Sequence, residues 1–159
     1  MEFKLLPLIV AALSTLVVGF VWYHPKVFGT VWMRESGTNP AEGKGPNMAL
    51  VFGMSLFYAF MISLILQHLV IHQWGAYAST VEIDADPSIF ENYMKAYGST
   101  YRTFQHGMLH GFMSGLFFAL PVIGTNALYE RRSWRYTLVT GGYWIIACMI
   151  MGGIICAWT

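Results

Sequence analysis

The chain has 159 residues, of which 56% are apolar and only 11% are charged, whereas about 25% of the residues in an ordinary soluble domain carry a charge. This composition excludes most soluble folds. The net charge of +1 excludes a basic surface for nucleic acid, so we expect no nucleic-acid partner.

Four stretches without Asp, Glu, Lys or Arg are each long enough for a helix to cross a bilayer. They cover residues 5–23, 48–71, 106–129 and 136–158. Little of the chain is left for a soluble domain. We therefore predict an all-α membrane protein in which residues 1–159 form a single domain of four transmembrane helices.

The first predicted span ends in large side chains, including Trp22 and Tyr23, whereas a cleaved signal peptide ends in small residues. We therefore expect this span to stay attached to the protein. After a turn at Pro25, Phe28 and Trp32 lie four residues apart in a segment that also carries cationic side chains. This pattern predicts a short amphipathic helix in the headgroup layer.

Two H-x-x-x-H pairs lie at neighbouring span ends. His68 and His72 close the second span, and His106 and His110 open the third. Residues four apart share a helix face, so four imidazoles converging here could bind zinc, copper or iron. A haem held by one histidine from each helix is a second possibility. Interfacial histidines that only exchange hydrogen bonds with water and headgroups are the alternative, and the sequence leaves any cofactor open.

The segment between the second and third spans is acidic and predicts an outward loop. Asp86-Pro87-Ser88 is typical of a helix start, and Gly98 is typical of a helix end. We therefore predict a short amphipathic helix over residues 89–97.

Small residues predict where helices pack closely. Gly107, Gly111, Gly115 and Ala119 follow one another at intervals of four in the third span, as in a glycine zipper. The fourth span also contains paired glycines, so we expect these two spans to form the tightest pair, although the same ridge suits a partner chain equally well. Pro121 predicts a kink near Phe117, because proline removes a backbone hydrogen bond.

The nine Lys and Arg residues predict the orientation of the chain. Three of them, Lys4, Lys95 and Arg102, lie near the termini or in the second loop. The other six lie in the first and third loops and favour the cytoplasm for these loops, which leaves both termini outside. These six residues are Lys26, Arg34, Lys44, Arg131, Arg132 and Arg135.

No Asp, Glu, Lys or Arg lies inside the four predicted spans, and the histidines near the span ends come closest to an intramembrane charge. Proton-coupled transporters usually carry such residues along their path, so this class is disfavoured. The sequence also lacks paired carboxylates, a catalytic triad order and a phosphate-binding glycine loop. The sequence therefore shows no catalytic group for an independent enzyme and leaves the question of enzyme activity open.

Two motifs at the predicted cytoplasmic end resemble a known family. The chain resembles domain-of-unknown-function family 1761 in the patterns G-x-x-W-Y-x-P-x-x-F-G-x-x-W-M and N-x-L-Y-E-R-x-S-W, the second of which is followed by G-Y-W. The segments that contain the histidine pairs resemble the Bacteroidetes-type members of this family. The resemblance implies a small four-span protein of a bacterial inner membrane, without an assigned activity. The motif positions include Trp22, Tyr23, Pro25, Phe28, Gly29, Trp32, Asn126, Glu130 and Trp134.

The sequence supports three functional hypotheses. The first is a structural or accessory subunit, or a homo-oligomer, that packs through its glycine-rich helices. The second is a metal-binding or haem-binding protein that uses the two histidine pairs. The third is a carrier of a lipid or small molecule near Asn126 and Glu130. We expect the lipid bilayer and either a second copy or a larger membrane complex as partners.

Overall fold

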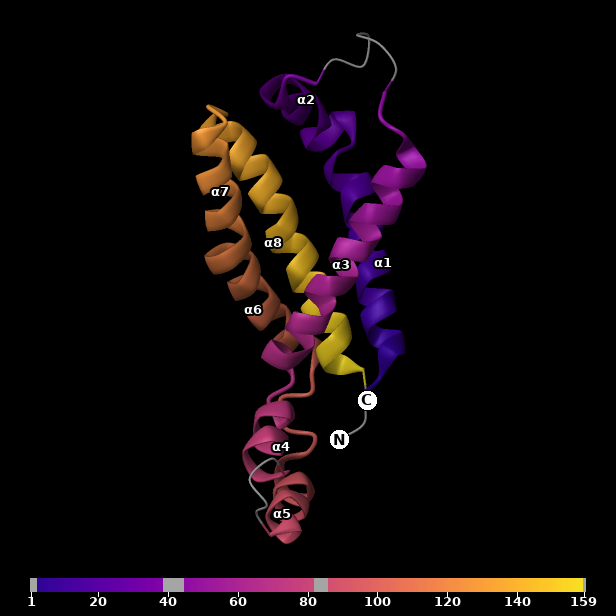
Figure 1. Ribbon diagram of the computed structural model, residues 1–159, viewed down its shortest axis with the longest axis vertical. Coiled ribbons are helices and arrows are strands. Elements are labelled where there is room, and N and C mark those ends of the chain that lie inside the picture. Colours follow the sequence, from indigo (N-terminus) through magenta and orange to yellow (C-terminus); the bar gives the residue numbers. More distant parts are fainter. Residues whose placement is uncertain (1–2, 39–44, 82–85, 159) are drawn as a thin grey trace.

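The computed structural model describes residues 3–38, 45–81 and 86–158 and shows a bundle of helices (Figure 1). Four helical segments are long and apolar enough to cross a membrane, which confirms the predicted all-α fold with four spans. The spans are α1 (Leu5–Trp22), α3 (Met48–Val70), a composite helix over Phe104–Tyr129, and α8 (Trp134–Ala157).

Polar capping residues determine where the third and fourth spans begin, and they do so more sharply than the start of each charge-free stretch. The third span begins at Phe104 and the fourth at Trp134, each two residues before the charge-free stretch used to predict it. The hydroxyls of Thr103 and Ser133 accept hydrogen bonds from backbone N–H groups in the first turns of these helices. Such a bond satisfies a donor that would otherwise lack a partner inside the helix, which fixes the start.

A short helical segment follows the first span, as predicted. His24 caps a π-helical turn, η1 (Pro25–Gly29), by accepting a hydrogen bond from the backbone N–H of Lys26 at 3.2 Å. The chain continues as α2 (Thr30–Ser36) and leaves the helix at Gly37, whose φ of 70° is accessible to glycine without strain.

The fourth span, α8, is the centre of the bundle and contacts each of the other three spans. Its C-terminal half packs against α1 and the end of α3 to form the core, which lies towards the end of the bundle that holds both chain ends (Figure 1). Many large apolar side chains on the other helices are exposed, as expected for surfaces that face lipid tails. The core residues are Leu8, Ala11, Leu66, Val70, Ile71, Cys148, Met151, Ile155 and Cys156.

The predicted glycine ridge lies against α8 of the same chain. A methyl group added at Gly107 or Gly111 would collide with the backbone of α8, at Gly152 and Cys148 respectively. A methyl group at Gly115 would also collide with the backbone, at Ile145. Only glycine therefore allows the two backbones to approach as they do.

The third span is not a continuous α-helix. It consists of α6 (Phe104–Ser114), a π-helical turn η2 (Gly115–Ala119) and α7 (Leu120–Tyr129). The irregularity predicted near Phe117 from Pro121 thus takes the form of a wide helical turn directly before the proline. Such turns are usual where an α-helix must accommodate a missing backbone donor or an extra residue.

The segment between the second and third spans forms two helices that extend beyond the bundle (Figure 1). The predicted helix is α5 (Pro87–Tyr97), with Asp86 as its cap and Gly98 after its end. The other helix, α4 (Gln73–Val81), was not predicted. Its Gln73 donates hydrogen bonds to the backbone oxygens of Tyr97 and Thr100, at 3.0 and 3.1 Å, and so ties α4 to the end of α5. The acidic residues Glu82 and Asp84 lie outside the described residues.

Candidate metal centre

Three of the four predicted histidines meet where α3 ends and α6 begins. His106 and His110 lie one turn apart on α6, and His72 lies in the turn between α3 and α4. One ring nitrogen of each histidine lies within 4.8 Å of the others. The Nε2 atoms of His72 and His106 are 2.9 Å apart, which is a hydrogen-bond distance. Such a bond requires one of the two nitrogens to donate and the other to accept.

This arrangement is close to what a tetrahedral metal ion requires. Nitrogens bound to zinc at their usual distance lie about 3.3 Å from one another. The Nε2 atoms of His72 and His106 would therefore need to separate by only a few tenths of an ångström. The third nitrogen, on His110, lies within 4.8 Å of the other two, and side-chain rotation of these exposed or half-buried residues is the movement that would draw the three together.

Tyr101 is a further member of the cluster that the histidine spacing did not predict. Its ring lies nearly parallel to that of His106, with centroids 4.9 Å apart and an angle of 21°. The backbone of Tyr101 has a φ of 63°, which is rare for a bulky side chain and strained. Strained backbone often occurs at functional sites, where the surrounding structure holds it in place.

His68 lies apart from this cluster. Its Nδ1 is 2.9 Å from the backbone oxygen of Leu64, and its ring packs against Trp74 with centroids 5.4 Å apart. The reason is that α3 ends at Val70 and Ile71 is extended, so His68 and His72 do not share a helix face. The sequence predicts four converging imidazoles, and the structure brings three of them together.

The residues of the first family-like motif meet at the opposite end of the bundle. The indole nitrogen of Trp22 donates a hydrogen bond to the backbone oxygen of Val139 in α8 at 3.0 Å, and its ring packs against Phe28. Tyr23 packs against Trp32 with ring centroids 5.5 Å apart. The structure therefore brings these aromatic residues together as a clamp between α1 and the segment that follows it, with Pro25 and Gly29 at the two ends of η1.

The second motif is less closely packed. Asn126, Glu130 and Trp134 are exposed. A carboxylate just beyond a helix C-terminus is unfavourable unless a cation compensates it, and Arg132 lies 3.6 Å from Glu130. These positions thus fit a local ion pair better than an enclosed binding site.

Contacts that the sequence did not predict join the first and third loops. The hydroxyl of Ser133 donates a hydrogen bond to a carboxylate oxygen of Glu35 at 2.6 Å, and Arg132 donates to the backbone oxygen of Ser36 at 2.5 Å. Arg34 pairs with the same carboxylate at 2.8 Å. Because Ser133 also caps α8, Glu35 connects α2 directly to the start of that helix.

This contact predicts a sensitivity to acid. The hydroxyl of Ser133, followed by Arg34, holds the pKa of Glu35 below its ordinary value of 4.5. A pKa that is lower in the folded than in the unfolded state stabilises the fold above the ordinary pKa, and this stabilisation is lost as the pH falls through the folded value. We expect the melting temperature of the wild-type protein in detergent to fall more steeply than that of Glu35→Gln between about pH 5 and about pH 3.

The matched control is Glu91→Gln, which removes a carboxylate from the exposed side of α5. Its pH profile should follow that of the wild type. Identical profiles for the wild type and Glu35→Gln would contradict a role for this carboxylate in holding α2 to α8.

Four spans, with a helical segment after the first span at one end and a helical extension at the other, define a small multi-pass membrane protein. The chain belongs to the DUF1761 family, described as a protein of unknown function, whose family model matches residues 6–156. No curated protein and no solved structure matches the chain. The family resemblance seen in the two motifs is thereby confirmed over nearly the whole length.

Proposed function

We propose that the protein binds a divalent transition-metal ion through His72, His106 and His110. The observation that carries this proposal is the convergence of three imidazole nitrogens within 4.8 Å at one end of the bundle. Imidazole suits zinc and copper, and three protein ligands leave a fourth position for water or a small ligand. The stacking of Tyr101 on His106 supports the proposal, because contacts around a ligating histidine fix its orientation.

A single ion fits this arrangement better than a haem. The ring centroids of His110 lie 4.6 and 5.0 Å from those of His106 and His72, so the three rings are in mutual contact. A haem with two axial histidines lies between their rings and keeps them from touching each other. The contact between the rings therefore favours an ion that draws the three nitrogens together.

The charge distribution supports an orientation for this site. The first and third loops lie at the opposite end of the bundle from both chain ends (Figure 1). Because these loops carry the larger share of Lys and Arg, we place them in the cytoplasm of a bacterial cell, with the protein in its inner membrane. The histidine cluster then faces away from the cytoplasm.

The structure gives the other two hypotheses less support. The glycine ridge is already covered by α8 of the same chain, so assembly with a second copy or a larger complex would need another surface. Asn126 and Glu130 are exposed, and the carboxylate of Glu130 is paired with Arg132. Neither feature favours a carrier at that end of the bundle.

Metal content tests the proposal directly. We expect wild-type protein purified in mild detergent, loaded with Zn²⁺ and passed through a desalting column, to retain about one ion per chain by elemental analysis. His106→Ala should weaken Zn²⁺ binding by about 100-fold or more in a chelator competition, because even loss of an outer contact to a ligating histidine costs about 10–100-fold. Co²⁺ should bind at the same site and give the visible absorption of a tetrahedral ion.

His68→Ala is the matched control, since it removes an imidazole from the same region but outside the cluster. This variant should bind Zn²⁺ like the wild type. Retention of Zn²⁺ by His106→Ala at wild-type affinity, or a wild-type protein that retains none, would overturn the proposal.

A further inference from the structure

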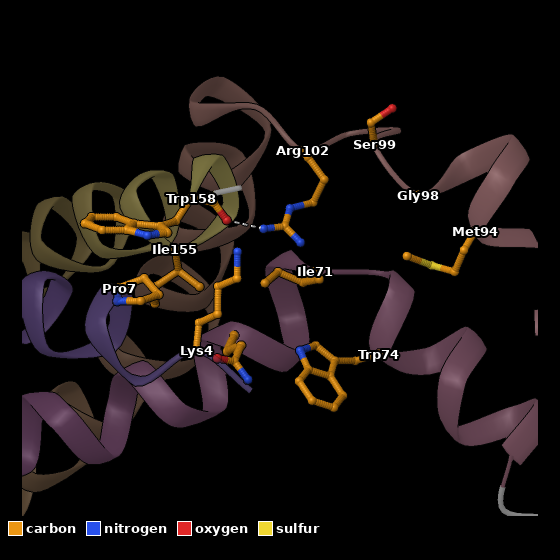
Figure 2. A pocket seen from close by; sticks show the side chains of 11 residues that line it. Lys4, Pro7, Ile71, Trp74, Met94, Gly98, Ser99, Arg102, Ile155 and Trp158 are labelled. Carbon is orange, nitrogen blue, oxygen red and sulfur yellow. Dashed lines mark hydrogen bonds between the residues drawn. The ribbon is translucent and has the colours of Figure 1, made fainter. Parts of the chain in front are cut away.

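A cavity lies at the end of the bundle that holds both chain ends (Figure 2). Its volume is about 290 Å³, near the lower end of the range for small-molecule pockets. It is lined by residues at or near the ends of all four spans and by the end of α5. No histidine lines it, so its lining shares no residue with the proposed metal site.

Two cationic side chains line this cavity. Lys4 precedes α1, Arg102 precedes α6, and Figure 2 shows both side chains extending into the same region. Arg102 donates hydrogen bonds to the backbone oxygens of Cys156 and Trp158, at 2.8 and 2.5 Å. These bonds hold the guanidinium in place and leave further N–H groups for a ligand. No acidic residue is among the described residues that line the cavity.

A buried amide gives a second and independent indication of a ligand. Gln67, one turn before the end of α3, lines the cavity and is only 3% exposed. Its Nε2 has no hydrogen-bond partner among the described residues. Buried donors are nearly always paired, because an unpaired one forfeits its bonds to water. A turn of the amide about its last side-chain bonds would present this donor to an acceptor oxygen in the cavity.

The rest of the lining is apolar and aromatic. Ile71 and Ile155 contribute apolar surface, and Trp74 and Trp158 lie at the level of the span ends, where indole rings favour the headgroup layer. A cavity with cations, an amide donor and apolar walls at this depth matches the chemistry of a phosphate group carried by an amphiphile.

We propose that this cavity binds a phosphate group, with Lys4 and Arg102 neutralising its charge and the Gln67 amide donating a hydrogen bond to one of its oxygens. The phosphate comes either from the headgroup of an anionic lipid or from free phosphate in solution. Both sources present the same oxygens to the same three side chains, and the experiment below separates them.

The test compares the melting temperature of detergent-purified protein alone, with micelles containing phosphatidylglycerol, and with inorganic phosphate at constant ionic strength. We expect stabilisation by at least one of these two probes. Stabilisation by phosphatidylglycerol alone assigns the site to a lipid headgroup, and stabilisation by inorganic phosphate assigns it to free phosphate. No stabilisation by either probe would overturn the proposal.

Two variants tie the effect to the cavity. Gln67→Leu removes the unpaired donor at similar volume, so it should fold with unchanged or raised stability and yet respond less to the probe. Lys4→Gln should weaken binding by roughly tenfold, as expected for the loss of one charge-assisted bond. Lys95→Gln on α5 does not touch the cavity and is the control. A response to the probe that is the same in all three variants would contradict the assignment.

Discussion

Gly111→Leu is expected to lower the free energy of unfolding by about 3 kcal/mol or more. The Cβ atom of any side chain at this position would collide with the backbone of Cys148 and Met149 on α8. Backbone cannot move aside as a flexible side chain can, so the third and fourth spans would have to separate. In a membrane this separation forfeits the close packing that holds helices together, because lipid tails provide no hydrophobic drive between them.

Gly53→Leu provides the matched control for this substitution. Gly53 lies in α3, and a methyl group added there meets nothing within 4 Å in the described structure. Leucine should be tolerated here, with a small gain from its higher helix propensity. Titration of both variants with a denaturing detergent, followed by circular dichroism, measures the difference. Equal stability of Gly111→Leu and Gly53→Leu would show that α6 and α8 do not pack at this distance.

Gly29→Ala is expected to cost about 1–3 kcal/mol, the usual effect of overpacking, and to disturb the aromatic clamp near it. The added methyl group would collide with the backbone oxygen of Tyr23, at the point where the chain turns back after α1. To relieve the collision the π-helical turn must open, which moves Phe28 and Trp32 away from their partners Trp22 and Tyr23 at the end of α1. The near-ultraviolet circular dichroism of these aromatic residues should lose intensity.

Gly45→Ala is the corresponding control in the same loop, because a methyl group at Gly45 meets nothing within 4 Å. Its spectrum and melting temperature should match those of the wild type. A wild-type spectrum for Gly29→Ala would mean that the motif glycine is not required by the turn.

Much of the fold could be predicted because its main determinants are local. Four charge-free stretches of sufficient length predict four spans, and Asp86 before Pro87 predicts the start of α5. The helix α4 was missed, since its nine residues contain neither a capping pair nor a regular apolar repeat. The third and fourth spans begin directly after their capping residues Thr103 and Ser133. Both residues are polar but uncharged, so the distribution of charged residues does not reveal these starts.

The candidate sites were less predictable because they depend on where helices end and on contacts between distant segments. His106 and His110 were placed correctly on one face of α6, whereas His72 reaches them only because α3 stops at Val70. Nothing in the sequence marks that end with a glycine or a proline. The pairing of Arg102 with the end of α8 spans more than fifty residues, and local periodicity carries no information about it.

The π-helical turn over Gly115–Ala119 has a consequence for the whole length of the third span. Residues four apart on an α-helix drift around its axis by about 40° with each step, so a straight helix would turn its small residues away from α8 within a few turns. One additional residue in the wide turn reverses about 100° of this drift. α6, η2 and α7 all keep contact with α8, and Ala127 near the far end is buried again. The turn thus brings the same face of the third span back towards α8. The two helices can then stay in contact from one side of the membrane to the other without winding around each other.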